Sequence, residues 1–119
     1  GNVLDPDLLL SKYGNDPVRW YLIKDITLGN DGDFQDRRFV DIINNDLANT
    51  IGNLLNRTTS MSRKWFDNKV PINNEITSES KLECLAKTSV ENYINKFNTY
   101  KLDQAANEVL NLAINTNLY

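Results

Sequence analysis

The sequence predicts a mostly α-helical domain, in which a helical bundle over residues 35–119 follows a small helical linker element over residues 1–34. Three observations predict this fold class. They are a long central segment with apolar residues at helical spacing, two Asp-Pro pairs before short apolar runs, and two further apolar stripes near the end. With 119 residues, 40% of them hydrophobic and 24% charged, the chain has the size and composition of one globular domain.

The linker element is expected to begin with two short helices. Asp-Pro pairs at residues 5–6 and 16–17 each supply an N-cap and a first-turn proline, and Gly14 ends the first helix. The second helix carries bulky apolar residues that we expect to be largely buried, namely Trp20, Tyr21 and Ile23.

The end of the linker element is rich in turn-forming residues. The GNDGD sequence at residues 29–33 predicts a structural turn, with room for one short strand at Thr27–Leu28 or Asp33–Phe34. Its acidic pair resembles half of a calcium loop. The alternating oxygen ligands and the closing Glu are missing, so we predict no metal site.

A helix is predicted to start near Gln35 and to end at residues 44–46, Asn-Asn-Asp. Neighbouring Asn and Asp side chains compete with helical hydrogen bonds and offer a cap to the next helix, so we expect a break or kink there. Gly52, in the middle of that next helix, costs up to about 1 kcal/mol relative to Ala, which predicts the close approach of another helix. The inward residues of the first helix are expected to be Phe39, Val40, Ile42 and Ile43.

The central helix, residues 44–64, has two distinct faces. The face predicted to be core carries Leu47, Ile51, Leu54, Leu55, Thr58, Met61 and Trp65. The opposite face, called the polar strip below, carries Asn49, Asn53, Asn56, Arg57, Ser60 and Lys64. The strip contains no carboxylate, whereas ordinary surface helices mix both charge signs. It is therefore a candidate contact surface, with an ordinary solvated helix face as the alternative.

Two members of the polar strip form a pair. Asn53 and Arg57 stand one helical turn apart, so an amide and a guanidinium project from the same side of the helix. Together they offer donors, an acceptor and a flat cationic face. A nucleobase is a flat polar group that such a pair could bind.

The last part of the chain predicts an antiparallel helix pair packed on the central helix. A loop over residues 68–77 leads to a helix from about Ser78, and Tyr100–Lys101 forms the turn into the final helix. The inner residues of the first helix are expected to be Leu82, Leu85, Ala86, Ser89, Tyr93, Ile94 and Phe97. Those of the second are Leu102, Ala105, Ala106, Val109, Leu112 and Ala113.

Composition excludes several functions. The formal net charge of -3 argues against nucleic-acid binding through bulk positive potential, so any RNA contact must be local. The chain has no histidine, no paired cysteine motif and no phosphate-binding glycine loop, so we predict no catalytic residue and no metal ligand. No apolar run is long enough to span a membrane, and we expect a cytoplasmic protein. The single cysteine, Cys84, is predicted to be buried.

Three separated motifs resemble the methionyl-tRNA synthetase family. GNVLDPDLLLSKYGNDPVRWYL, the GNDGDF loop and NNDLANTIGNLLNRT follow one another in family order from Gly1 to about Lys64. The resemblance is to the region after the catalytic domain, so the bundle would be the anticodon-binding domain of a class I synthetase, here lacking its C-terminal end. In the family, the Asn and Arg of the N-L-x-x-R motif contact the anticodon, which implies this role for Asn53 and Arg57.

The resemblance implies further expectations. The other residues of the polar strip, Asn49, Asn56, Ser60 and Lys64, would contact the tRNA backbone or nearby atoms. The linker element would connect this bundle to the catalytic domain of the same protein, and tRNA(Met) would be the partner. ATP and methionine would be used by that catalytic domain, so this chain, taken as an excised fragment, is expected to hold no cofactor and to be inactive alone.

Two alternative functions remain open at this point. The chain could be the anticodon-binding domain of another class I synthetase, because related enzymes share the helical bundle. It could also be a helical protein-interaction module, whose polar strip would meet another protein. Salt-dependent protection of tRNA would distinguish these possibilities, since phosphate contacts make RNA binding fall steeply with salt.

Overall fold

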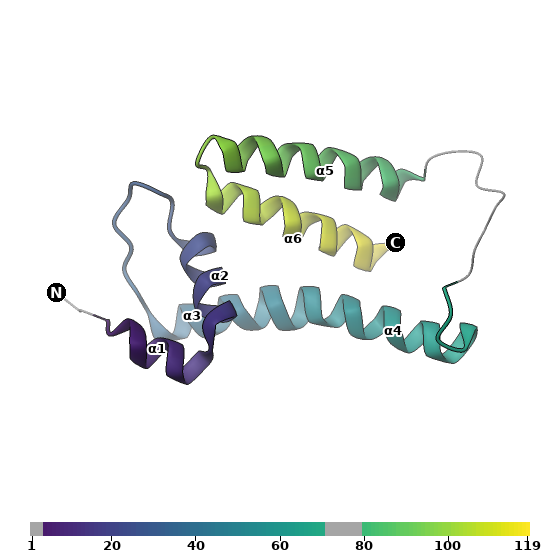
Figure 1. Cartoon of the computed structure of the whole chain (residues 1–119), viewed down its shortest axis with the longest axis horizontal. Helices are drawn as coiled ribbons and strands as arrows, with labels where there is room; N and C mark the ends of the chain where they lie inside the picture. Colours follow the sequence, from purple (N-terminus) through teal and green to yellow (C-terminus); the bar gives the residue numbers. More distant parts are fainter. Residues whose placement is uncertain (1–3, 71–79) are drawn as a thin grey trace.

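The computed structural model describes residues 4–70 and 80–119 and confirms the mostly helical fold class. Its elements are α1 (Pro6–Tyr13), α2 (Asn15–Asp25), α3 (Asp36–Ile42), the π-helix η1 (Ile43–Gly52), α4 (Asn53–Phe66), α5 (Lys81–Asn98) and α6 (Leu102–Leu118). Figure 1 shows one long rod formed by α3, η1 and α4, with α1 and α2 at its α3 end and α6 lying between the rod and α5. In the described ranges no helix is long and apolar enough to cross a membrane.

The first helix forms as its sequence predicts. The side chain of Asp5 accepts a hydrogen bond from the Asp7 main-chain N–H, with 3.0 Å between the atoms. At the other end Gly14 has a φ of 82° and donates its N–H to the oxygen of Leu10. The second helix starts at Asn15, one residue before Asp16, and no side chain caps it. The predicted Asp16 cap is therefore wrong.

The predicted short strand is also wrong. No strand is present among the described residues, and Asn30 instead closes a turn by donating its N–H to the oxygen of Thr27 at 3.0 Å. An isolated extended pair of residues has no second strand with which to form a ladder, so turn geometry prevails here.

An aromatic core joins the linker element to the long rod. Phe39 of α3 is fully buried, and its ring lies 4.5 Å from that of Tyr13 and 5.1 Å from that of Tyr21, measured between centroids. Tyr21 is buried as predicted, whereas Ile23 is 39% exposed because it lies off the side of α2 that meets this core. The division of the chain at residue 34 stays a prediction, since the core includes residues from both sides of it.

The α-helix α3 ends at Ile42, just before residues 44–46, but the backbone continues through them as the π-helix η1. The predicted break is therefore wrong, and a change of helix type stands in its place. One of the side chains expected to end the helix has another partner, because the carboxylate of Asp46 accepts a hydrogen bond from the indole N–H of Trp20 at 3.0 Å. In the same stretch the hydroxyl of Thr50 donates to the main-chain oxygen of Asn45 at 2.8 Å. A Cβ on Gly52 would lie 3.0 Å from the oxygen of Leu47, so the close neighbour is its own helix rather than another one.

The predicted antiparallel pair of helices, packed on the rod, is confirmed by α5 and α6. Ser80 caps α5 by accepting the N–H of Glu83 at 3.1 Å, and Tyr100, with a φ of 60°, makes the turn into α6. The expected start at Ser78 and nearly all of the expected loop lie outside the described residues. The side chains of Lys96 and Glu108 form an ion pair between the two helices, which lowers the pKa of Glu108.

Burial within the pair follows the predicted stripes only in part. The buried residues are Ser89 of α5 and Ala105, Ala106, Leu110 and Ala113 of α6, so Leu110 was missed. Farther along α5, Tyr93, Ile94 and Phe97 are 37%, 51% and 50% exposed, and Val109 of α6 is 40% exposed. These predictions are wrong because α6 covers one side of α5 and the apolar stripe is wider than that contact. Cys84 is exposed rather than buried, since it lies off the inner stripe of α5.

Candidate nucleic-acid interface

The polar strip occupies one exposed side of the long rod. Asn53 and Arg57 lie in the first two turns of α4 and are both exposed, as predicted. The other four members are exposed as well, with Asn49 on η1 and Asn56, Ser60 and Lys64 on α4. Because α3, η1 and α4 form one uninterrupted rod anchored at the aromatic core, the strip is held on a rigid support rather than on a loop (Figure 1).

The charge of α4 is opposite to that of the chain as a whole. From Asn53 to Phe66 the helix carries Arg57, Arg63 and Lys64 and no Asp or Glu, while the chain has a formal net charge of -3. Positive potential is therefore concentrated on this helix. Such a local patch suits contacts to phosphates and base edges without requiring a basic protein.

Arg57 also contacts the end of α6. Its Nη1 donates a hydrogen bond to the main-chain oxygen of Asn117, with 3.5 Å between the two atoms. The side chain of Asn117 in turn donates to the main-chain oxygen of Thr50 at 3.2 Å. Sequence reasoning missed Asn117, because nothing in the periodicity of α6 marks a residue in its last turn as a partner of the rod.

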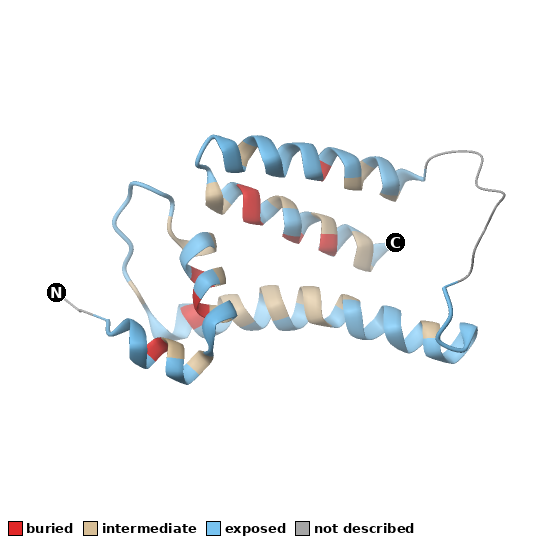
Figure 2. Cartoon of the chain, in the orientation of Figure 1, coloured by how far each residue is buried: buried red, intermediate tan, exposed pale blue. Residues whose placement is uncertain are grey.

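The predicted apolar face of the central helix is only partly covered. Ile51 and Leu54 are half-buried, but Trp65 is 61% exposed, so its predicted burial is wrong. The reason is visible in Figure 1, where α6 ends alongside α4 and α4 continues past it. Figure 2 shows the same end of α4 as almost entirely exposed. Leu55, Thr58 and Met61, also expected in the core, are exposed too.

An apolar pocket lies at this uncovered end of α4. It has a volume of about 300 Å³ and is lined by Thr58, Met61, Ser62, Trp65, Phe66, Lys69 and Val70. The ammonium of Lys64 lies 5.9 Å from the centroid of the Trp65 ring, within the range of a cation–π contact. The polar strip and an exposed aromatic ring are therefore neighbours on the same helix.

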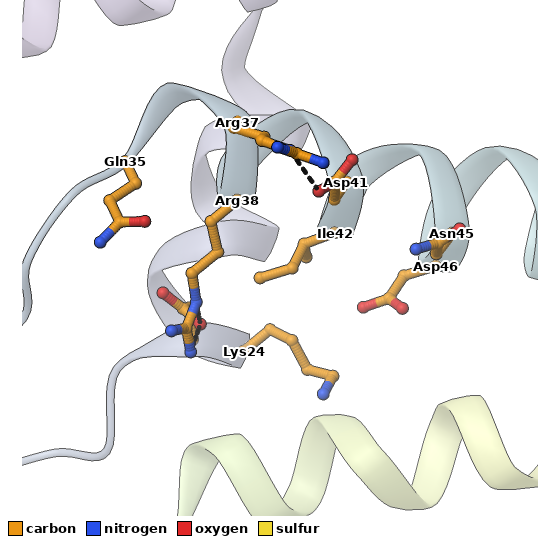
Figure 3. A pocket seen from close by; sticks show the side chains of 9 residues that line it. Lys24, Gln35, Arg37, Arg38, Asp41, Ile42, Asn45 and Asp46 are labelled. Carbon is orange, nitrogen blue, oxygen red and sulfur yellow. Dashed lines mark hydrogen bonds and ion pairs between the residues drawn. The ribbon is translucent and has the colours of Figure 1, made fainter.

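A second, polar pocket of about 490 Å³ lies between α2 and the start of the rod (Figure 3). Its lining holds three cations, Lys24, Arg37 and Arg38, and as many carboxylates. Arg38 pairs with Asp25 at 2.6 Å, and Arg37 lies 3.9 Å from Asp41. Burial and the neighbouring Asp25, which lines this pocket, raise the pKa of Tyr21 to about 12. Across the described ranges no group of three or more His, Cys, Asp or Glu could hold a metal ion. The balanced charges make this pocket a weaker candidate for binding an anion than α4.

The amino-acid sequence of this chain is similar to those of known proteins from one family. The family model for class I tRNA synthetases (M) matches residues 1–59. The chain is 39% identical to the methionine–tRNA ligase of Oceanobacillus iheyensis over 121 aligned residues, which cover 100% of this chain and 18% of that protein. It is 43% identical to the ligase of Thermosynechococcus vestitus, over 95% of this chain and 22% of that protein.

The fold is similar to a solved structure from the same family. The crystal structure of Mycobacterium tuberculosis methionyl-tRNA synthetase bound by methionyl-adenylate superposes with a TM-score of 0.85 at 32% identity, over 95% of this chain and 23% of that one. These similarities show that the chain corresponds to part of a class I aminoacyl-tRNA synthetase. Within that class, the chain belongs to the methionyl-tRNA synthetase family. It spans only 18% and 22% of the length of the two curated relatives above.

Proposed function

We propose that this chain recognises the anticodon of tRNA(Met) as part of a methionyl-tRNA synthetase. The observation that carries the proposal is the exposure of Asn53 and Arg57, one turn apart, on a helix without carboxylates. Proteins recognise RNA loops by addressing the polar edges of splayed bases, often with stacking on their faces. The Asn53 amide offers a donor and an acceptor for such an edge, and the Arg57 guanidinium adds a fork of donors and a flat face.

The rest of the polar strip would support this recognition. Asn53 and Arg57 are called the reading pair below. Uncharged hydrogen-bonding groups surround this pair on Asn49, Asn56 and Ser60, and Lys64 supplies a positive charge for a phosphate. Phosphate contacts orient an RNA without reading its sequence, whereas base contacts discriminate. We therefore assign discrimination to Asn53 and Arg57 and general affinity to Lys64.

The enzymatic reaction would belong to the longer protein. The curated relatives are methionine–tRNA ligases, and we propose that the longer protein activates methionine with ATP and transfers it to tRNA. This chain would contribute no catalytic residue, metal ligand or cofactor site, and its partners would be tRNA and the catalytic domain of the same protein. Methionine-dependent exchange of pyrophosphate into ATP by the purified 119-residue chain would contradict that assignment.

The experiment that tests the proposed function is protection of tRNA from nucleases. Full-length synthetase containing this chain should protect the anticodon nucleotides of tRNA(Met), and the protection should weaken as salt is raised. A transcript with a replaced anticodon serves as the control and should be protected less. Absence of protection at the anticodon would contradict the proposal and would favour a protein-interaction module.

A further inference from the structure

Asn117, in the last turn of α6, forms hydrogen bonds to two residues of the long rod. Its side-chain Nδ2 donates to the main-chain oxygen of Thr50 on η1, with 3.2 Å between the atoms. Its own main-chain oxygen accepts from Nη1 of Arg57 on α4, at 3.5 Å. Asn117 therefore contacts the rod on both sides of Asn53, in the stretch that carries the reading pair.

The second of these contacts fits the electrostatics of a helix end. The last carbonyl groups of a helix have no partner within the helix and form the negative end of its dipole. The guanidinium of Arg57 supplies a positive donor to one of them. An arginine side chain has many rotamers, and holding it in place before binding lowers the entropy that is lost when it meets a ligand.

We infer that Asn117 is a positioning residue that holds Arg57 in the orientation required for reading the anticodon. This inference rests on the proposed function of Arg57. The atom that accepts from Arg57 belongs to the main chain, so it persists whatever residue stands at position 117. The side chain of Asn117 instead fixes where that oxygen lies, through its bond to Thr50. Losing the side chain should loosen Arg57 without removing its partner.

The first test is Asn117→Ala in the full-length synthetase. Affinity for tRNA(Met) should fall about threefold to tenfold, the lower part of the range for coupled neighbouring residues, and discrimination against an anticodon-swapped transcript should fall with it. In an Arg57→Ala background the same substitution should have no further effect on discrimination. That non-additivity is a readout that a purely structural role for Asn117 would not produce.

A second variant, Asn117→Leu, keeps the packing at this position. Oδ1 of Asn117 is buried without a hydrogen-bond partner among the described residues, and the oxygen of Thr50 also accepts the N–H of Asn53. An apolar side chain of similar shape should therefore be tolerated in the fold. It should lower discrimination as much as Asn117→Ala does. The matched control is Asn115→Ala, because the Asn115 amide donates within α6, to the oxygen of Asn111.

The outcomes separate this inference from the proposed function. If Arg57→Ala lowers discrimination while Asn117→Ala and Asn117→Leu leave it unchanged, Asn117 does not position Arg57 and the proposed function stands. The same conclusion follows if Asn117→Ala lowers discrimination equally with and without Arg57. If Arg57→Ala itself leaves discrimination unchanged, the proposed function is wrong and the inference falls with it.

Discussion

The two ends of the long rod differ in how they are held. At the α3 end, Phe39 is 0% exposed and is surrounded by aromatic rings from the linker element. At the α4 end no residue is buried, and Trp65 and Phe66 are 61% and 47% exposed. The rod of α3, η1 and α4 therefore has one buried end, called the embedded end, and one exposed end, called the presented end.

A small helical domain can in this way hold exposed side chains on an ordered backbone. The embedded end contributes most of the burial that stabilises the rod. The continuous helical backbone then fixes the positions of exposed side chains on α4, which contribute little to folding. Between the two ends, Asn117 of α6 forms hydrogen bonds to Thr50 and Arg57 of the rod. Substitutions at the embedded end should therefore change stability, whereas those in the polar strip should change binding.

The largest effect is expected from Phe39→Ala. Removing a fully buried ring should lower the free energy of unfolding by about 3 to 5 kcal/mol, measured by urea denaturation of the 119-residue chain. Trp65→Ala is the matched substitution at the other end and should cost far less, because the ring is 61% exposed. Similar costs for the two rings would remove the distinction between the ends.

A binding effect of intermediate size is expected from the reading pair. In the full-length synthetase, Asn53→Ala or Arg57→Ala should each cost about 1 to 3 kcal/mol of binding free energy toward tRNA(Met), as for a specific base contact. Arg63→Ala is the control, since Arg63 is an exposed cation on the same helix outside the polar strip. The account would fail here if Arg63 mattered as much as Arg57 in equilibrium binding.

A smaller effect should appear at alkaline pH and at the embedded end. Tyr21 has a pKa raised to about 12 in the folded chain, against 10.0 as its ordinary value. Its neutral form is favoured by folding, so this stabilisation is complete below pH 10 and is lost as the pH rises toward 12. Unfolding followed by circular dichroism should show stability falling in that window. Tyr21→Phe should make the fall shallower, and an unchanged fall would show that another group is responsible.

The smallest effect is expected from Lys64→Ala. If Lys64 meets only phosphate, its loss should weaken binding of cognate and anticodon-swapped transcripts alike and reduce the salt slope by about one. Titrations at several salt concentrations measure both quantities. A loss of affinity confined to the cognate transcript would instead show that Lys64 helps to discriminate the anticodon.

The sequence predicted most of the helices because their signals are local. Asp5 and Gly14 define α1 through capping geometry, as predicted. The exposed position of Asn53 and Arg57 followed from helical periodicity alone. Their role in binding RNA stays a prediction that came from the resemblance to a family.

The features that sequence reasoning missed depend on tertiary contacts. The break expected at residues 44–46 is absent because Asp46 bonds to Trp20 from α2 instead of capping a helix. Trp65 is exposed because α6 ends before reaching it. The apolar pattern of each helix does not predict how far one helix extends along the other. Asn117 was missed for the same reason, since its partners Thr50 and Arg57 are far away in the sequence.

The central claim is that the polar strip of the rod reads the anticodon through Asn53 and Arg57. The most direct measurement is the ratio of affinities for tRNA(Met) and for an anticodon-swapped transcript, compared between the wild-type synthetase and the Asn53→Ala and Arg57→Ala variants. The account predicts that each variant loses affinity mainly for the cognate transcript, so that the ratio falls toward one. Equal losses on both transcripts would contradict the claim and leave the strip as a general surface.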